Sequence, residues 1–290
     1  KKLLLPFGKM NQALMQKKQT SKQYLYNRIK FLMENSVISK EQRLAEENTE
    51  FDRNIMFSIL VPLYNTPLNF LEEMIASVVA QTYSNWELCL ADGSDDKHKE
   101  VGHFVKKLAA KDKRIRYKKL KHNLGISDNT NACIDMSTGN YIALFDHDDI
   151  LHSSALFEIM KVICNKEADF VYTDEAVFEN EIYNIKLTHF KPDFSPDTLR
   201  GHNYICHFTA FNRKLLNIAG KFSNKYDGSQ DYDLFLRLTE KAKTIVHVPK
   251  VLYFWRSHPL SVASDVSVKP YCVDSAKKAL SEHLMRIGLN

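Results

Sequence analysis

The sequence has few cysteines and no long apolar run. Its five cysteines are scattered and form no Cys-x-x-Cys pair, which argues against a disulfide framework and against a zinc cage. The longest uncharged apolar run, residues 56–64, is about half of what a bilayer crossing needs. Residues 1–10 are too short for a signal peptide. We therefore expect a soluble, cytoplasmic protein whose thiols are reduced.

Positive charge is concentrated at the N-terminal end. The net charge is +5, but residues 1–43 carry ten Lys and Arg against two Glu, so the remainder is acidic. Apolar side chains at helical spacing predict amphipathic helices there, and we assign residues 1–54 to a basic helical lead-in. One interpretation is a packed or solvated helix; the other is a surface that docks on anionic lipid at the inner face of the plasma membrane. No nucleic-acid-binding module accompanies the charge, so we expect no nucleic-acid partner.

Apolar runs alternate with helical periods from residue 57 onward. This order predicts an α/β protein with a mostly parallel, doubly wound sheet, followed by a smaller α+β region. The expected strands are residues 57–63, 87–91, 115–120, 141–145 and 170–173, with helices between them. After these we expect a hairpin over 176–190, a helix over 230–242, strands at 245–248 and 251–255, and a last helix over 270–288.

The apolar run at 141–145 ends in Asp146, His147, Asp148 and Asp149. Carboxylates at the end of a buried strand either carry a large desolvation cost or bind a cation. Mg²⁺ and Mn²⁺ prefer oxygen ligands, and they usually take a minority of them from protein and the rest from water and phosphate. Asp92 ends another predicted strand, and ligands of such sheets bind where these strand ends meet. The pattern predicts a Mn²⁺ or Mg²⁺ site and a phosphate-bearing substrate; the alternative is a solvated turn that caps the next helix.

Five motifs occur in an order and spacing that resemble the family 2 glycosyltransferases. They are Val61-Pro62-Leu63-Tyr64-Asn65, Ala91-Asp92-Gly93-Ser94, Asn123-Leu124-Gly125-Ile126-Ser127, Asp146-His147-Asp148-Asp149 and Gly228-Ser229-Gln230-Asp231-Tyr232-Asp233-Leu234. The likeness spans roughly residues 56–263. Together with Lys191-Pro192-Asp193-Phe194, Asn203-Tyr204-Ile205 and Leu252-Tyr253-Phe254-Trp255-Arg256, the motifs are similar to those of bacterial enzymes that build O-antigen, capsule and rhamnose-rich polysaccharides.

The resemblance implies a glycosyltransferase A-type fold and an inverting transfer that depends on a divalent metal. Residues 55–175 would form the nucleotide-sugar-binding half, 176–265 the acceptor-binding half, and 266–290 a C-terminal helix. A hexose or rhamnose would pass from a UDP- or dTDP-linked donor to a glycan or lipid-linked acceptor during synthesis of cell-surface polysaccharide. The metal would neutralise charge on the departing diphosphate, and a carboxylate would take the proton of the acceptor hydroxyl.

The resemblance also implies roles for single residues. Asp148 would bind the metal, and Asp146 would lie near the ribose. His258 would reach the metal from the far side of the cleft, unless it is an ordinary loop histidine. Asp231 matches the family's catalytic base, although Gln230 replaces the acid that many relatives carry before it. The other interpretation of Asp231 is a helix N-cap.

Further positions would bind the nucleotide sugar. These are Pro62, Tyr64, Asn65, Asp92, His147 and Arg256. The Asp92 carboxylate would accept from a pyrimidine ring N–H, and Arg256 would pair either with phosphate or with a surface carboxylate. Asp149 would assist the metal or hold the loop. His207 and Trp255 would line the acceptor pocket or pack in the core.

Three other functions fit the sequence less well than a glycosyltransferase does. A nucleotidyltransferase would need a glycine- and lysine-rich phosphate loop near the first strand, which residues 63–67 do not provide. A glycosidase would use two carboxylates but would need neither a metal nor a site for a base. A catalytically inactive module that binds glycan or scaffolds a larger polymerase is the alternative outside enzymology. The presence of both Asp148 and Asp231 argues against it.

Overall fold

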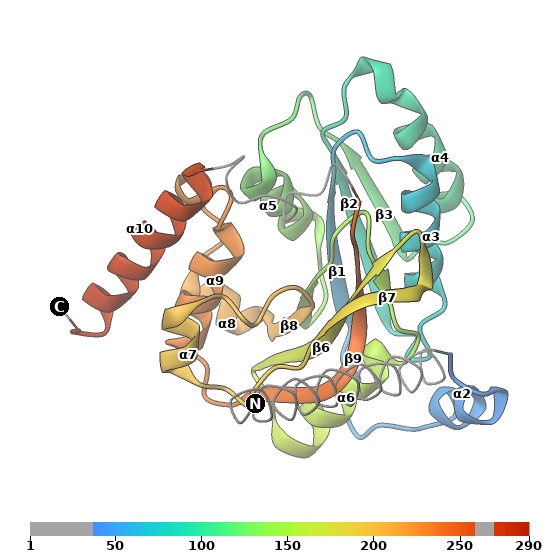
Figure 1. Cartoon of the computed structure of the whole chain (residues 1–290). Helices are drawn as coiled ribbons and strands as arrows, with labels where there is room; N and C mark the ends of the chain where they lie inside the picture. Colours follow the sequence, from blue (N-terminus) through green and yellow to red (C-terminus); the bar gives the residue numbers. More distant parts are fainter. Residues whose placement is uncertain (1–36, 259–269, 290) are drawn as a thin grey trace, which may run out of the picture. The chain divides into compact units, whose positions relative to one another are not determined.

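A computed structural model describes residues 37–258 and 270–289, and a nine-stranded mixed sheet forms the centre of this part of the chain (Figure 1). The strand order is β3-β2-β1-β4-β8-β6-β9-β5, and β7 pairs with β6. The strands are β1 (Phe57–Leu63), β2 (Trp86–Asp92), β3 (Ile115–Lys119), β4 (Tyr141–Leu144), β5 (Ile150–Leu151), β6 (Phe170–Glu179), β7 (Glu181–His189), β8 (Thr209–Asn212) and β9 (Ile245–Arg256). The helices are α2 (Lys40–Glu47), α3 (Leu68–Val79), α4 (Lys99–Ala109), α5 (Ile126–Met136), α6 (Ala155–Lys166), α7 (Pro196–Gly201), α8 (Arg213–Ala219), α9 (Gln230–Thr239) and α10 (Pro270–Arg286).

Most of the predicted basic lead-in lies outside the described residues. The amphipathic helices and the lipid-docking surface expected in residues 1–36 therefore stay predictions. The described part of the lead-in includes α2, whose Glu46 is buried and accepts hydrogen bonds from the hydroxyls of Thr82 and Ser154. Among the described helices, none combines the length and the apolar character that a bilayer crossing requires.

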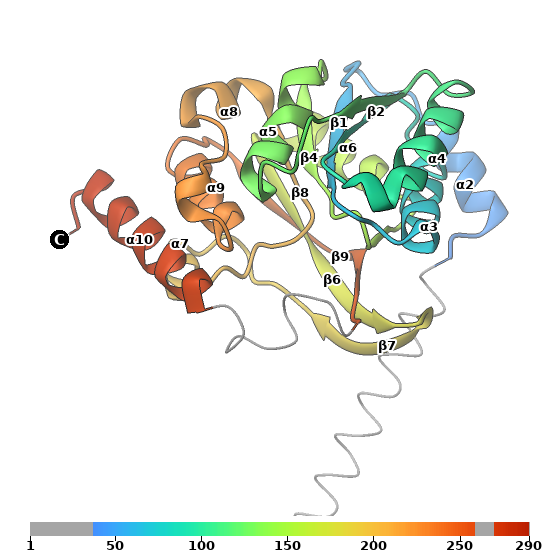
Figure 2. The same ribbon diagram turned by 90° about the horizontal axis from the view of Figure 1, so that it is seen from above.

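Helices cover both faces of the parallel strands. The side chains of β1 are all buried and alternate between the faces: Ile59 packs with Leu88 and with α3, α4 and α6, whereas Leu60 packs with Cys89 and α5. Figure 2 shows α3 and α4 on one side of the sheet and α5, α8 and α9 on the other. Burial on both faces explains why these strands read as continuous apolar runs, and it confirms the predicted α/β class.

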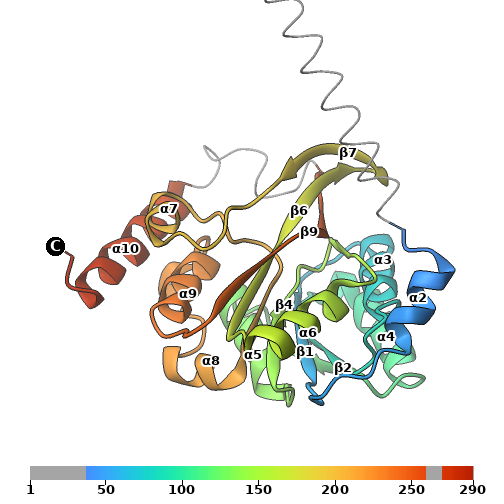
Figure 3. The ribbon, with the colours of Figure 1, turned by 90° about the horizontal axis from the view of Figure 1, so that it is seen from below.

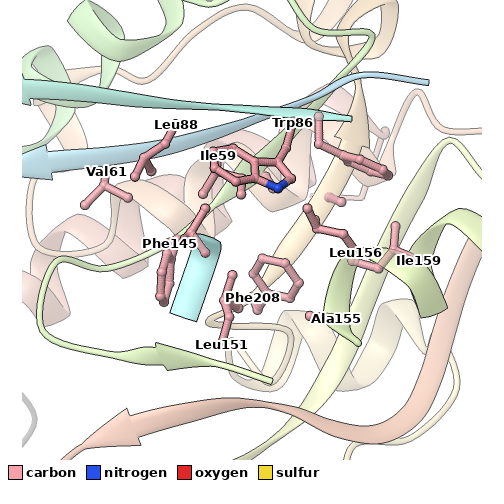
Figure 4. Close-up of a cluster of buried hydrophobic side chains, with 14 of the residues drawn as sticks. Ile59, Val61, Trp86, Leu88, Phe145, Leu151, Ala155, Leu156, Ile159 and Phe208 are labelled. Carbon is pink, nitrogen blue, oxygen red and sulfur yellow. The ribbon is translucent and has the colours of Figure 1, made fainter. Parts of the chain in front are cut away.

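The hydrophobic core that includes buried residues of α3 and α6 joins residues from distant parts of the chain. Figure 4 shows Ile59, Trp86, Phe145, Leu156 and Phe208 gathered in one cluster, in which each is buried. Each such side chain contributes roughly 1.5–3 kcal/mol when it leaves water. Because Phe208 precedes β8, the second half of the chain completes the core of the first half.

Strands β6 and β9 are longer than the sequence pattern indicated. The strand expected at 170–173 continues to Glu179 and returns as β7 after a turn at Asn180, so the predicted hairpin is an extension of the same strand. β9 is one strand where two were expected, because its parallel ladder with β6 resumes after a register shift at Pro249 and Lys250. Proline has no N–H to donate, and it is tolerated at such irregularities. Figure 3 shows the β6–β7 hairpin extending away from the helices.

Gly139 allows β1 and β4 to pair closely. A Cβ at this position would lie 2.6 Å from the carbonyl oxygen of Met56 and 2.6 Å from Ser58 Oγ. We expect Gly139→Ala to lower the free energy of unfolding by about 2–3 kcal/mol, because backbone must move to admit the methyl group. Urea denaturation measures the change. Gly201→Ala is the matched control, since a Cβ there meets nothing within 4 Å, and equal stability of the two variants would contradict the prediction.

Candidate active site

The acidic loop after β4 lies at the carboxyl edge of the parallel strands. Its last residue, Asp149, is buried, and Tyr253 and Arg256 of β9 fasten it. The Tyr253 hydroxyl donates to Asp149 Oδ2, and the backbone N–H of Arg256 donates to Oδ1 at 2.7 Å. Burial and the charges of Asp148 and Asp146 raise the pKa of Asp149 well above its ordinary value. This geometry favours the loop-holding role of Asp149 over direct help to a metal.

Asp146 lies where three separate segments meet. Its side chain is accessible to solvent, but the protein atoms crowded around the carboxylate desolvate it and raise its pKa. The charges of Asp148 and Asp231 act in the same direction, whereas His207 lowers the pKa. Contacts support the same arrangement. The Tyr253 hydroxyl lies 3.4 Å from Asp146 Oδ2, and the Tyr253 ring stacks on His207. Asn203, four residues before His207, donates to Asp231 at 2.8 Å. The loop after β4, the segment before β8 and the start of α9 therefore converge.

Asp148 and His258 face each other across the site. His258 Nε2 lies 2.9 Å from Asp148 Oδ2, and both side chains remain partly accessible. Beside them, Nδ1 of His147 lies 4.0 Å from Asp148 Oδ1, is buried and has no hydrogen-bond partner among the described residues. A carboxylate and an imidazole form a donor set that suits Mn²⁺ or Mg²⁺ with substrate oxygens completing the shell. The residues fit a divalent metal, although in the described part of the chain no three acidic, His or Cys side chains form a ready-made cage.

Arg256 fixes the position of the acidic loop that follows β4. Its guanidinium is buried between the rings of Phe70 and Phe178, at 4.4 and 4.6 Å from their centroids. It donates from Nε to the carbonyl oxygen of Asp148 at 2.6 Å and pairs with Glu73 of α3. The sequence left two possible partners for Arg256, a phosphate or a surface carboxylate, and the structure shows the carboxylate of Glu73. The phosphate contact stays a prediction.

We expect Arg256→Lys to lower kcat about tenfold while the protein stays folded. A lysine keeps the charge but cannot donate in two directions at once from a planar group, so the Asp148 loop loses its support. The measurement is the Mn²⁺ or Mg²⁺ concentration that gives half-maximal turnover, which should rise along with the loss of kcat. Arg114→Lys is a matched control, because that guanidinium also covers a ring, Trp86 at 3.9 Å, but lies away from the loop. A wild-type metal requirement in Arg256→Lys would contradict the positioning role.

Asp231 is the second residue of α9. Asn203 donates from Nδ2 to its Oδ2 at 2.8 Å, and Ser229 occupies the N-cap position of the helix. Burial raises the pKa of Asp231, while the backbone N–H of Tyr232 and the charge of His207 oppose the rise. A carboxylate with a raised pKa is a stronger proton acceptor, as a general base requires.

The predicted nucleotide-binding residues lie at the ends of β1 and β2. Pro62 is buried in β1, and Tyr64 is exposed just after it. Asn65 has a left-handed backbone and ties the two strand ends together, since its N–H donates to Ser94 Oγ at 2.9 Å. Asp92 is 1% exposed and accepts from the Tyr117 hydroxyl at 2.6 Å and from the N–H of Ser94 at 2.8 Å. The Asp92 carboxylate thus has protein partners of its own, and the contact of these four residues with a nucleotide stays a prediction.

One charged group of the site was not anticipated from the sequence. Glu175 of β6 is buried and accepts from His189, Lys191 and His207. Burial by itself would raise the pKa of Glu175, but the hydrogen bonds from the two histidines and the charge of Lys191 hold it well below its ordinary value. The signal was an acidic pair, Asp174-Glu175, that follows an apolar strand, and it was overlooked because the strand was expected to end at Thr173.

The chain matches a known protein family over more than half of its length. Residues 58–219, more than half of the chain, match the family described as glycosyl transferase family 2. The chain is a member of that family. The uncharacterized protein y4gI of Sinorhizobium fredii is 40% identical over 247 residues, and the O-antigen biosynthesis protein RfbC of Myxococcus xanthus is 30% identical over 245 residues. Each match covers 84% of this chain but only 27% and 19% of the relatives, so the chain spans a minor part of their length.

Solved structures share the fold of this family member. TarS residues 1–349 of S. aureus, in complex with UDP-GlcNAc, match over 80% of this chain and 67% of that chain, with a TM-score of 0.64 and 16% identity. The mannosyltransferase PcManGT of Pyrobaculum calidifontis, in complex with GDP-Man and Mn²⁺, matches over 86% and 70%, with a TM-score of 0.56 and 14% identity. The glycosyltransferase A-type fold implied by the motifs is confirmed.

Proposed function

We propose that this chain is a metal-dependent, inverting glycosyltransferase in cell-surface polysaccharide synthesis. It would move a hexose or rhamnose from a nucleoside-diphosphate donor to a glycan or lipid-linked acceptor. The observation that carries the proposal is the convergence of Asp231, at the start of α9, with the acidic loop after β4, connected through the contacts of Asn203, His207 and Tyr253. The name of the relative RfbC and the UDP-GlcNAc and GDP-Man complexes of the two structural neighbours support the same class of reaction.

The donor side of the reaction depends on the loop after β4. Asp148 and His258 would hold the metal, which when bound supplies a positive charge to the departing diphosphate. Asp149 keeps Asp148 in place through its bonds to β9, and Arg256 does so from the other side through the Asp148 carbonyl. Asp146, recessed and accessible, lies where a ribose hydroxyl can donate to it.

The acceptor side depends on Asp231. An acceptor hydroxyl becomes a nucleophile as its proton passes to this carboxylate, while the bond from the sugar to the diphosphate breaks on the opposite face. Asn203 orients the carboxylate by donating to its Oδ2 at 2.8 Å. Attack from the face opposite the leaving group inverts the anomeric centre.

The test is a screen of the purified protein against UDP-, GDP- and dTDP-linked sugars with Mn²⁺ or Mg²⁺. We expect metal-dependent binding of one class of nucleotide sugar and release of its nucleoside diphosphate, which increases when the right acceptor glycan is added. Chelation with EDTA should abolish the release, and added metal should restore it. Glycan binding without any nucleotide binding would refute the proposal and identify an inactive binding module.

A further inference from the structure

His207 lies between the two halves of the proposed active site. It precedes β8, and it contacts Glu175 of β6 through two groups: its backbone N–H donates to Glu175 Oε2 at 2.8 Å, and its ring Nδ1 lies 3.1 Å from the same oxygen. Lys191 donates to that oxygen at 3.0 Å, so Glu175 is itself fixed. Main chain and side chain of His207 are therefore bound to one immobile carboxylate.

Two aromatic rings of β9 fix the plane of the His207 ring. Tyr253 stacks on it with a centroid distance of 5.5 Å and an interplanar angle of 4°, and the ring of Trp255 lies 4.4 Å away. A cation placed against an aromatic face is stabilised by the ring quadrupole. Rings on β9 and a carboxylate on β6 thus leave His207 a single orientation.

The charges around His207 are unevenly distributed. The titratable or charged groups that face it or its partner are Glu175 of β6, His189 at the end of β7, Lys191 after β7, Asp146 and Asp149 of the loop after β4, Tyr253 of β9 and Asp231 of α9. His207 Nε2 has no hydrogen-bond partner among the described residues and is not one of their buried unsatisfied atoms. With Nδ1 directed at Glu175, the other ring nitrogen remains available on the side of the site.

We propose that His207 is a positioning residue, a fixed imidazolium that keeps Asp231 ionised as the acceptor-side base. This inference rests on the proposed glycosyl transfer and adds a residue to it. Burial of His207 would favour its neutral form, but the hydrogen bond and charge of Glu175 outweigh this effect and raise the pKa of His207 to about 9. Asn203, which donates to Asp231 at 2.8 Å, lies in the same short segment as His207, and the Cys206 thiol donates to the Asn203 carbonyl oxygen at 3.2 Å, so the backbone that carries His207 turns beside Asp231. At neutral pH the ring therefore carries a charge near Asp231, where it opposes the effect of burial on that carboxylate.

The direct test is NMR titration of Asp231 and His207, which requires no turnover. The Asp231 carboxyl resonance is assigned by its loss in Asp231→Asn, and its midpoint is compared between wild type and His207→Asn. Asparagine can still donate to Glu175 but carries no charge, so we expect the Asp231 midpoint to rise by about one pH unit. The control is His189→Asn, because His189 also bonds Glu175, at 2.8 Å, and should leave the Asp231 midpoint unchanged.

Three results would overturn the proposal. One is an unchanged Asp231 midpoint in His207→Asn, with His207→Gln as the second variant should the first fail to fold. Another is a wild-type His207 that titrates near its ordinary 6.5. The third is an acid limb of the kcat profile that stays in place in His207→Asn while kcat falls, since a merely structural role would give that pattern. If no activated sugar is turned over, the proposed function fails, and the NMR titrations still decide the role of His207.

Discussion

Asp231→Asn is expected to lower kcat by about 10²- to 10⁴-fold while the dissociation constant of the nucleotide sugar changes less than about twofold. The amide has the shape of the carboxylate and can still accept from Asn203, so the fold and the donor half are retained. It cannot take a proton from the acceptor hydroxyl. Single-turnover kinetics separates the chemical step from donor binding and product release.

The pH profile gives an independent check on Asp231. The base works only when it is ionised, and burial raises the pKa of Asp231. Turnover should therefore be full at higher pH and fall as the pH drops through this raised value, at a higher pH than an ordinary aspartate would give. Asp197→Asn is the control, because that aspartate is 90% exposed and pairs with Arg200 on the surface. A loss confined to donor affinity would contradict the role of Asp231 as base.

Asp148→Asn is expected to lower kcat/KM by about 10²- to 10³-fold when the metal is supplied at a concentration that saturates the wild-type protein. Asparagine offers a neutral amide oxygen where the metal would have a carboxylate, and it also weakens the pair with His258 at 2.9 Å. The effect should appear first as a higher metal requirement. Titration of activity with Mn²⁺, together with calorimetry of Mn²⁺ in the presence of the nucleoside diphosphate, measures it.

A matched control for Asp148→Asn is Asp96→Asn, whose side chain is 96% exposed beside Lys99. It removes the same charge from the surface and should leave the metal requirement unchanged. Circular dichroism should show that both variants are folded. If Asp148→Asn retained wild-type turnover at wild-type metal concentrations, the metal role of Asp148 would be refuted.

The fold was predictable from the sequence where apolar runs are continuous. β1 was expected at residues 57–63 and is found at Phe57–Leu63, because a strand covered on both faces must be apolar throughout. The short helix α7 is not among the elements expected from the sequence, since Pro196 and the residues just before it are typical of turns. In the structure Pro196 takes the first turn and Ser195 caps the helix by accepting from the N–H of Thr198. α8 has only seven residues, too few for a periodic pattern to stand out.

The candidate site was predictable where the chemistry is local. The acidic run at 146–149 stands out, because charge at the end of an apolar strand is visible in a few consecutive residues. Asp231 was implied only by the resemblance of residues 228–234 to a motif of the family. The partner of Arg256 is Glu73, which is 183 positions away. No short-range pattern records such a pair. Glu175 and His207 likewise meet only because β6, β8 and β9 are neighbours in the sheet.

The antiparallel ladder between β4 and β8 limits how the described part of the chain can move. β4 leads into the acidic loop and β8 follows His207, and the two strands pair from Tyr141 with Asn212 to Leu144 with Thr209. A hinge between β4 and β8 would have to break these backbone hydrogen bonds. Under the proposed glycosyl transfer, we therefore expect the choice of sugar and acceptor to depend on the loops at the carboxyl edge of the strands rather than on a clamshell closure.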